Sequence, residues 1–346
     1  MGHRVMDYAA LAVSLGVAFA VTLALLPPWI RAAHRAGLVG RDMNKPGNVM
    51  VAEAGGLTAV LGALMGLYML ILYYRYIRNA DFHSTEVFAL SSLLLLSALI
   101  GFLDDILGWK KGLPRWIRIT AMAPASTPLV VIKAGVPTIE LPLIGVVNLG
   151  VLYPLVAVPI GVVGAANGFN MLGGYNGLEA GMGFLLMASA AIYAALKGLT
   201  LACMASLVMA AALAAFLVYN WYPARVFPGN TLTYAVGSYY AGVVVLGNFE
   251  KFGVALFTLY FVKAILYFLG LLKGVWREGV EDFAIPQPDG SIKAPISGPY
   301  SLQHIVIRLL ERLRGRATEE GVVVSILSIQ ALLSAALLLL AWRGLI

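Results

Sequence analysis

Residues 201–219 read LACMASLVMAAALAAFLVY, an apolar run without a single charged side chain. A helix needs about 20 consecutive apolar residues to cross a hydrocarbon core about 30 Å thick. The same rule marks about ten segments of the chain: residues 8–30, 55–74, 87–103, 116–132, 144–163, 180–196, 201–219, 232–246, 252–272 and 322–342. The sequence therefore predicts an all-α integral membrane protein, a bundle of about ten transmembrane helices in one polytopic domain over residues 1–346.

The composition agrees with a membrane protein. The chain is 60% hydrophobic and 12% charged, whereas soluble domains average about 45–50% apolar and about 25% charged residues. The single cysteine, Cys203, lies inside an apolar segment and offers neither a disulfide nor a pair of metal ligands. The sequence lacks zinc-protease, serine-hydrolase and P-loop motifs, which argues against those enzyme classes.

The distribution of positive charge predicts the orientation. Sixteen of the 24 Lys and Arg residues fall in the odd-numbered loops. Cytoplasmic loops carry the excess of positive charge, so these loops should be cytoplasmic and both termini outside the cell membrane. The net charge of +7 then reflects topology and anionic headgroups, and gives no reason to expect nucleic acid as a partner. The longest cytoplasmic loop, residues 273–321, should hold a hairpin at Asp289-Gly290 and an amphipathic helix.

The third loop opens with two adjacent carboxylates, in Gly101-Phe-Leu-Asp104-Asp105. Carboxylates at the end of an apolar span are costly unless they face a polar cavity. With the nearby Lys111 and Arg115, they suit a magnesium phosphate ester, in which acids orient the metal and cations neutralise phosphate oxygens. The alternative is a helix end at headgroup depth with ordinary snorkelling charges.

The fifth loop, residues 164–181, is rich in glycine and amides and contains Asn167, Asn170, Asn176 and Glu179. Glycine lets the backbone approach a phosphate or a base, and Asn oxygens can ligate Mg²⁺. Asn-Gly is also a turn signal, but a turn needs fewer such residues than this loop contains. The pattern favours a binding site.

Two further signals are weaker when taken alone. Residues 220–231 supply an aromatic ring, Phe227, a cation, Arg225, and an amide, Asn230, although they equally fit an interfacial aromatic belt with a Pro-Gly turn. Glu53 begins an apolar segment, where it could cap a helix or receive hydroxyl groups of a polar substrate.

Together, these loops resemble the polyprenyl-phosphate N-acetylhexosamine-1-phosphate transferase family, and within it the dolichyl-phosphate N-acetylglucosamine-1-phosphate transferases. Residues 167–179, NGFNMLGGYNGLE, are similar to that branch's Asn-Ala-x-Asn-x-x-Ala-Gly-x-Asn-Gly-Leu-Glu. Residues 220–227, NWYPARVF, are similar to its Asn-Trp-Tyr-Pro-Ser-Arg-Val-Phe, and Gly101 to Asp105 to its Gly-x-x-Asp-Asp. The ten-helix topology of the family agrees with the number of apolar segments.

The resemblance implies that N-acetylglucosamine 1-phosphate passes from UDP-N-acetylglucosamine to a polyprenyl (dolichyl) phosphate, with release of UMP and help from Mg²⁺. It implies Asn170 and Asn230 as metal ligands, and Asp104, Asp105, Lys111 and Arg115 as catalytic residues. The implied substrate-binding residues are Glu53 for the sugar, Gly174, Asn176 and Phe227 for uracil, and Asn167, Glu179 and Arg225 elsewhere in the site. The reader of the N-acetyl group is open, with Lys293, His304 and Arg308 as candidates.

The chain departs from the family at one expected metal ligand, because Asn230 replaces the acid of the usual Phe-x-Gly-Asp. The last loop also lacks the histidine run of the bacterial phospho-MurNAc-pentapeptide translocases. Two alternatives stay open: the same reaction with another UDP-N-acetyl sugar or undecaprenyl phosphate, and a secondary transporter with polar broken helices. Abundant Gly and Ala permit close helix packing and a homodimer without requiring one.

Overall fold

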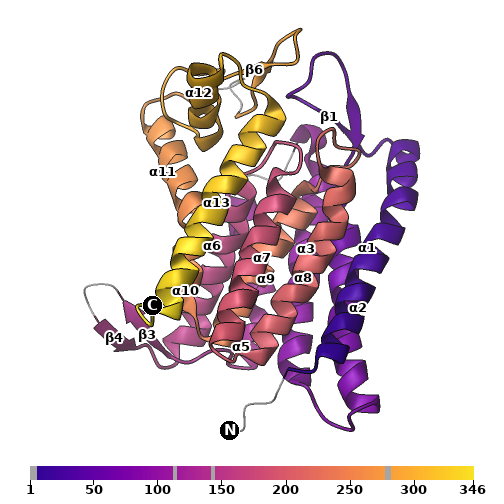
Figure 1. Ribbon diagram of the computed structural model, residues 1–346, viewed down its shortest axis with the longest axis vertical. Coiled ribbons are helices and arrows are strands. Elements are labelled where there is room, and N and C mark those ends of the chain that lie inside the picture. Colours follow the sequence, from indigo (N-terminus) through magenta and orange to yellow (C-terminus); the bar gives the residue numbers. More distant parts are fainter. Residues whose placement is uncertain (1–5, 112–114, 142–144, 277–281) are drawn as a thin grey trace.

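The computed structural model describes residues 6–111, 115–141, 145–276 and 282–346 (Figure 1). The helices are α1 (Tyr8–Ala36), α2 (Gly56–Tyr76), α3 (Ser84–Lys111), α4 (Arg115–Ala125), α5 (Thr127–Val131), a π-helical turn (Tyr153–Ala157), α6 (Val158–Met171), α7 (Leu178–Leu196), α8 (Thr200–Asn220), α9 (Gly229–Gly247), α10 (Glu250–Leu256), α11 (Thr258–Leu272), α12 (Leu302–Arg314) and α13 (Glu319–Trp342). The strands form three antiparallel pairs: β1 (Val39–Arg41) with β2 (Met50–Ala52), β3 (Thr138–Leu141) with β4 (Gly145–Asn148), and β5 (Ile285–Pro286) with β6 (Ile292–Lys293).

The described residues contain seven helices that are long and apolar enough to cross a membrane, or eight if the bent pair α10–α11 counts as one span. Those two helices meet at an angle of 55°. The fold is thus that of an all-α protein with several membrane-spanning helices, but the predicted number of ten spans is not confirmed.

Besides this bent pair, two of the predicted spans are not among the seven, and one other begins later than predicted. Residues 116–132 form two short helices, α4 and α5, with Pro124 inside the first and Pro128 in the first turn of the second. Residues 145–148 of the predicted fifth span form strand β4, so the helical span begins only at Tyr153. Asn167 and Asn170 therefore lie on the last turns of α6, although they were expected in a loop.

Helix α9 is the second predicted span that is not among the seven, and it lies at the centre of the bundle, where it packs against α2, α3, α6, α7 and α8. Sixteen of its 19 residues are buried. Its Thr, Ser and Tyr side chains make it too polar to qualify as a span by hydropathy, but they contact protein and need not face lipid.

The polar segments gather at one end of the bundle. Figure 1 shows strands β1 and β6 and helix α12 at the upper end, whereas β3, β4, the start of α1 and the C-terminus lie in the lower half. At Asp289-Gly290, β5 pairs with β6 across the turn that the sequence suggested. All five segments predicted to carry chemistry thus end at the same face of the molecule.

Helices α3 and α9 approach closely because Gly101 has no side chain. A Cβ atom at Gly101 would lie 2.3 Å from the carbonyl oxygen of Asn230 and 2.7 Å from the amide nitrogen of Thr231. These are backbone atoms of the first turn of α9, so they cannot move aside cheaply. The glycine therefore sets how near Asp104 and Asp105 come to that turn.

We predict that Gly101→Ala lowers the free energy of unfolding by about 1–3 kcal/mol, because the methyl group must push α3 away from α9. Thermal unfolding of the detergent-purified protein measures this change. Gly164→Ala in α6 is the matched control, since nothing lies within 4 Å of its Cβ position. Equal unfolding midpoints for the two variants would show that the close approach is not required.

Candidate functional site

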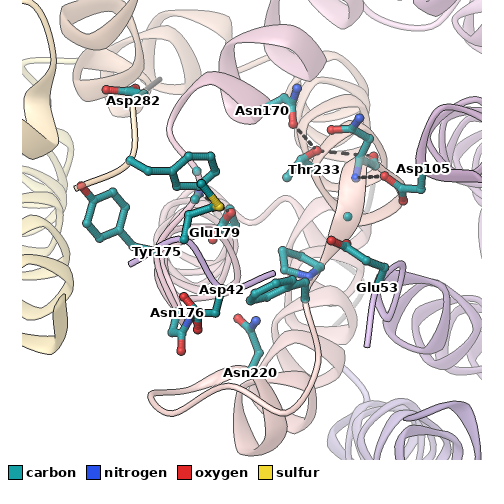
Figure 2. Close-up of a pocket in the computed structure, with 18 of the residues that line it drawn as sticks. Asp42, Glu53, Asp105, Asn170, Tyr175, Asn176, Glu179, Asn220, Thr233 and Asp282 are labelled. Atoms are coloured by element: carbon teal, nitrogen blue, oxygen red, sulfur yellow. Dashed lines mark hydrogen bonds between the residues drawn. The ribbon is translucent and has the colours of Figure 1, made fainter. Parts of the chain in front are cut away.

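A cavity of about 400 Å³ lies where the connections at the upper end of the bundle meet. It is lined by the α1–α2 connection, the end of α3, the α6–α7 and α8–α9 connections and the segment after α11. Eight of the residues predicted from the sequence line it: Glu53, Asp105, Asn170, Gly174, Asn176, Glu179, Phe227 and Asn230. Figure 2 shows the side chains of five of them, Glu53, Asp105, Asn170, Asn176 and Glu179, around a common space.

Asp105 caps the N-terminus of α9. Its Oδ1 accepts a hydrogen bond from the backbone amide of Asn230 at 2.6 Å, and its Oδ2 accepts from the amide and hydroxyl of Thr231 at 3.0 and 2.6 Å. A carboxylate at this position satisfies free amides and favours the positive end of the helix dipole. Gly229 makes room for it, because a Cβ there would lie 2.3 Å from Asp105 Oδ2.

Asp104 and the two predicted metal ligands occupy the same wall. Asp104 is 2% exposed, and its Oδ2 accepts a hydrogen bond from Asn230 Nδ2 at 2.7 Å. Thr233 Oγ1 donates to Asn170 Oδ1 at 2.8 Å and lies 3.4 Å from the carbonyl oxygen of Asn230. The structure thus brings Asn170 and Asn230 together through Thr233, a residue that the sequence pattern did not single out.

Glu53 faces this wall from the connection between β2 and α2 (Figure 2). The connection is held by the backbone of Phe227, whose amide donates to Ala52 at 2.7 Å and whose carbonyl accepts from Gly55 at 2.9 Å. Because Gly55 is the cap of α2, Glu53 lies outside the first turn, and the capping alternative does not hold. Burial, with the charges of Asp105 and Glu179, raises the pKa of Glu53 from 4.5 to about 7.

A buried polar network joins the loops on the other side of the cavity. Lys45 Nζ donates to Asp42 Oδ2 at 2.5 Å, to Asn176 Oδ1 at 2.6 Å and to Glu319 Oε2 at 3.1 Å. Asn44 Nδ2 donates to the carbonyl oxygen of Gly174 at 2.7 Å. These contacts connect the α1–α2 segment, the α6–α7 segment and the start of α13.

The amide of Asn176 belongs to this network as much as to the cavity. Its Nδ2 donates to Asp42 at 3.1 Å, its Oδ1 also accepts from the amide of Ala224 at 2.8 Å, and its backbone amide donates to Glu319 at 2.7 Å. Asn176 is 3% exposed. Its side chain therefore holds three segments in place, which leaves little of it for direct contact with a base.

Comparison with known proteins identifies the family. Residues 87–248 match the family described as glycosyl transferase family 4. The chain is 33% identical to a Saccharolobus solfataricus protein over 88% of each chain, and 34% identical to a Sulfolobus acidocaldarius protein over 92% of each. The chain belongs to glycosyl transferase family 4.

Both archaeal relatives are named, provisionally, UDP-N-acetylglucosamine–dolichyl-phosphate N-acetylglucosaminephosphotransferase. A Dictyostelium discoideum protein carries the same name without qualification and is 28% identical over 80% of this chain and 71% of its own.

The stretch that matches glycosyl transferase family 4 extends from α3 to α9 and so includes the wall formed by Asp104, Asp105, Asn170 and Asn230. Glu53 precedes it. The lining residues Arg41, Asp42 and Met43 also precede it, whereas Asp282 and Phe283 follow it. The matched stretch therefore forms only part of the cavity. Segments on either side of it in the sequence supply the other lining side chains.

Other predicted residues lie away from the cavity. Asn167 donates to Val163 within α6, Arg225 is exposed beside the ring of Tyr219, and Lys293 is exposed on β6. Arg308 donates to the carbonyls of Ile296 and Gly298.

His304 is fully buried behind a lining residue, with Nε2 3.1 Å from the carbonyl oxygen of Asp282, and burial lowers its pKa. The side chains of Lys111 and Arg115 lie outside the described residues.

The cavity is strongly acidic. Five carboxyl groups and one guanidinium line it among the described residues: Asp42, Glu53, Asp105, Glu179, Asp282 and Arg41. No group of three His, Cys, Asp or Glu in the described part of the chain could hold a metal ion by itself. The amide oxygens of Asn170 and Asn230 beside two carboxylates nevertheless fit Mg²⁺, which usually takes few protein oxygens and completes its shell with water and substrate phosphates.

The raised pKa of Glu53 predicts how stability changes with pH. The folded protein binds a proton at Glu53 between pH 4.5 and about 7, where the unfolded chain has lost it. The protonated Glu53 carboxyl therefore stabilises the folded protein most at low pH, and this contribution to the free energy of unfolding is lost as pH rises toward 7. Glu53→Gln should gain stability relative to the wild type from pH 5 to pH 8. Thermal unfolding across this range tests the prediction, with the exposed Glu320→Gln as control, and parallel pH curves for Glu53→Gln and wild type would contradict it.

Proposed function

We propose that this chain transfers N-acetylglucosamine 1-phosphate from UDP-N-acetylglucosamine to a polyprenyl phosphate of the dolichyl type, with release of UMP. The names of the relatives from three organisms support this activity. The observation that carries it is the polar cavity at one end of an apolar helix bundle, lined by motif residues from four separate segments. Such a place lets a water-soluble nucleotide sugar meet a lipid phosphate.

The surroundings of the cavity suit both substrates. Helix α11 exposes large apolar side chains on its outer face, among them Ile265, Phe268 and Leu272, as expected of a helix beside lipid. The cavity offers the flat rings of Tyr175, Phe227 and Phe283 to a base.

We infer that Mg²⁺ accompanies the nucleotide. A diphosphate would be repelled by the acidic lining unless cations neutralise it. Asn170 and Asn230 would hold the ion, which would supply positive charge to the diphosphate during transfer. Lys111 and Arg115, at the facing ends of α3 and α4, would add to that charge.

The reaction needs positioning more than acid or base chemistry. An oxygen of the lipid phosphate attacks the β-phosphorus, the bond from that phosphorus to the bridging oxygen breaks, and its electron pair leaves with UMP. A phosphate monoester loses its second proton at a pKa of about 6, so the attacking oxygen needs no base at neutral pH. Asp105 then acts by fixing the first turn of α9, and Glu53 can accept hydrogen bonds from sugar hydroxyls.

The orientation is part of this proposal. The basic loops at the cavity end support an orientation with that end on the cytoplasmic side, by the positive-inside rule. Both termini would then lie outside, since the start of α1 and the C-terminus lie in the lower half of Figure 1. The homodimer suggested by the small-residue content stays a prediction.

The proposal predicts that the purified protein releases UMP only when UDP-N-acetylglucosamine, dolichyl phosphate and Mg²⁺ are all present. EDTA should abolish release, and Asp105→Asn should lower the rate at least about 100-fold, since it removes a charge that fixes the site. Asp289→Asn, in the exposed β5–β6 turn, is the control and should keep full activity. Failure to release UMP with dolichyl or other polyprenyl phosphates would reject the transferase.

A further inference from the structure

The amide of Asn230 lies between a buried carboxylate and the cavity. Its Nδ2 donates to Asp104 Oδ2 at 2.7 Å, while the residue itself lines the cavity. Its backbone cannot shift easily, because its amide donates to Asp105 at 2.6 Å and its carbonyl packs on Gly101. Asn230 is therefore fixed at both its main chain and its side chain.

We propose that Asp104 is a positioning residue that holds the Asn230 amide with its oxygen toward the cavity and lends that oxygen negative character. A carboxylate only accepts hydrogen bonds, so it can be satisfied only by the NH₂ side of the amide. The opposite orientation would place two oxygens against each other in a buried position. Asp104 thereby decides which end of Asn230 a cavity cation meets.

The charge of Asp104 adds to this effect. Hydrogen bonds inside a protein polarise one another, so an amide whose NH₂ donates to an anion has a more electron-rich oxygen. Asp104 is 2% exposed, and water screens its charge little at this depth. The cavity wall thus has the neutral amide of Asn230, hydrogen-bonded to the buried Asp104 carboxylate, in place of an anionic ligand.

This inference rests on the proposed function only in taking the cavity to bind a divalent cation. It can be tested without substrate, by thermal unfolding of the detergent-purified protein over a series of Mg²⁺ concentrations. Two quantities are read for each variant: the midpoint without Mg²⁺, and the Mg²⁺ concentration that gives half of the midpoint increase.

Asp104→Asn should raise the half-saturating Mg²⁺ concentration about tenfold, the effect of losing one charge-assisted hydrogen bond. An asparagine can donate or accept, so it no longer dictates the orientation of Asn230. Asp289→Asn, which removes an exposed acid, should leave the titration unchanged. An unchanged titration for Asp104→Asn would overturn the positioning role.

A double variant that exchanges the side chains of Asp104 and Asn230 tests whether the two residues act as a pair. Asn230→Asp sets a half-buried carboxylate against the buried carboxylate of Asp104, so its midpoint without Mg²⁺ should fall, and Mg²⁺ should raise that midpoint more than in the wild type. In Asp104→Asn/Asn230→Asp, the new amide can donate to the new carboxylate, and the midpoint should recover toward the wild-type value. A double variant whose loss equals the sum of the single losses would show that the pair is not coupled.

The outcomes separate this inference from the proposed function. A wild-type midpoint that Mg²⁺ does not move would reject the cation and with it the inference, whether or not UMP is released. The expected pattern in the four variants, together with no release of UMP by the wild type, would leave the inference standing and reject the transferase.

Discussion

The ammonium group of Lys45 contacts carboxylates or amides from three segments that are far apart in the sequence, through Asp42, Asn176 and Glu319. The Lys45 side chain is 13% exposed and the two carboxylates are 2% exposed. Removing one member of such a buried pair costs about 3–5 kcal/mol, because an uncompensated charge is left behind. Around this contact, the loop ends keep fixed positions, so the cavity on their inner side has a defined shape before any substrate enters.

The apolar segments were predictable where an uninterrupted run coincides with one helix, as in residues 201–219, which lie within α8. The predicted number of spans is not confirmed where proline divides an apolar run or where neighbouring helices enclose a helix. Pro124 and Pro128 divide a run that hydropathy alone joins, and α9 is buried by its neighbours although its composition is that of a half-polar helix. Both effects depend on local geometry or on tertiary contacts, which hydropathy does not record.

The site also contains residues that the sequence identified and residues that only the structure shows. Asp104, Asp105, Asn170 and Asn230 were found because their clusters are unusual at the ends of apolar runs, and the structure brings them to one wall. Thr231 ended a predicted loop and Thr233 began a predicted helix, and neither was singled out. Lys45 looked like one of many loop cations, and its partner Glu319 follows it by more than 270 positions. Only the fold shows that such residues hold the loops, whereas sequence spacing shows the groups that carry the chemistry.

The central claim is that a phosphorylated sugar, not a free sugar, moves to the lipid. The most direct measurement follows UDP-N-acetylglucosamine labelled at the β-phosphorus with purified protein, dolichyl phosphate and Mg²⁺. We expect the label to enter the lipid extract together with the sugar, while unlabelled UMP stays in the aqueous phase. Label that remains in aqueous UDP while the sugar enters the lipid would contradict it.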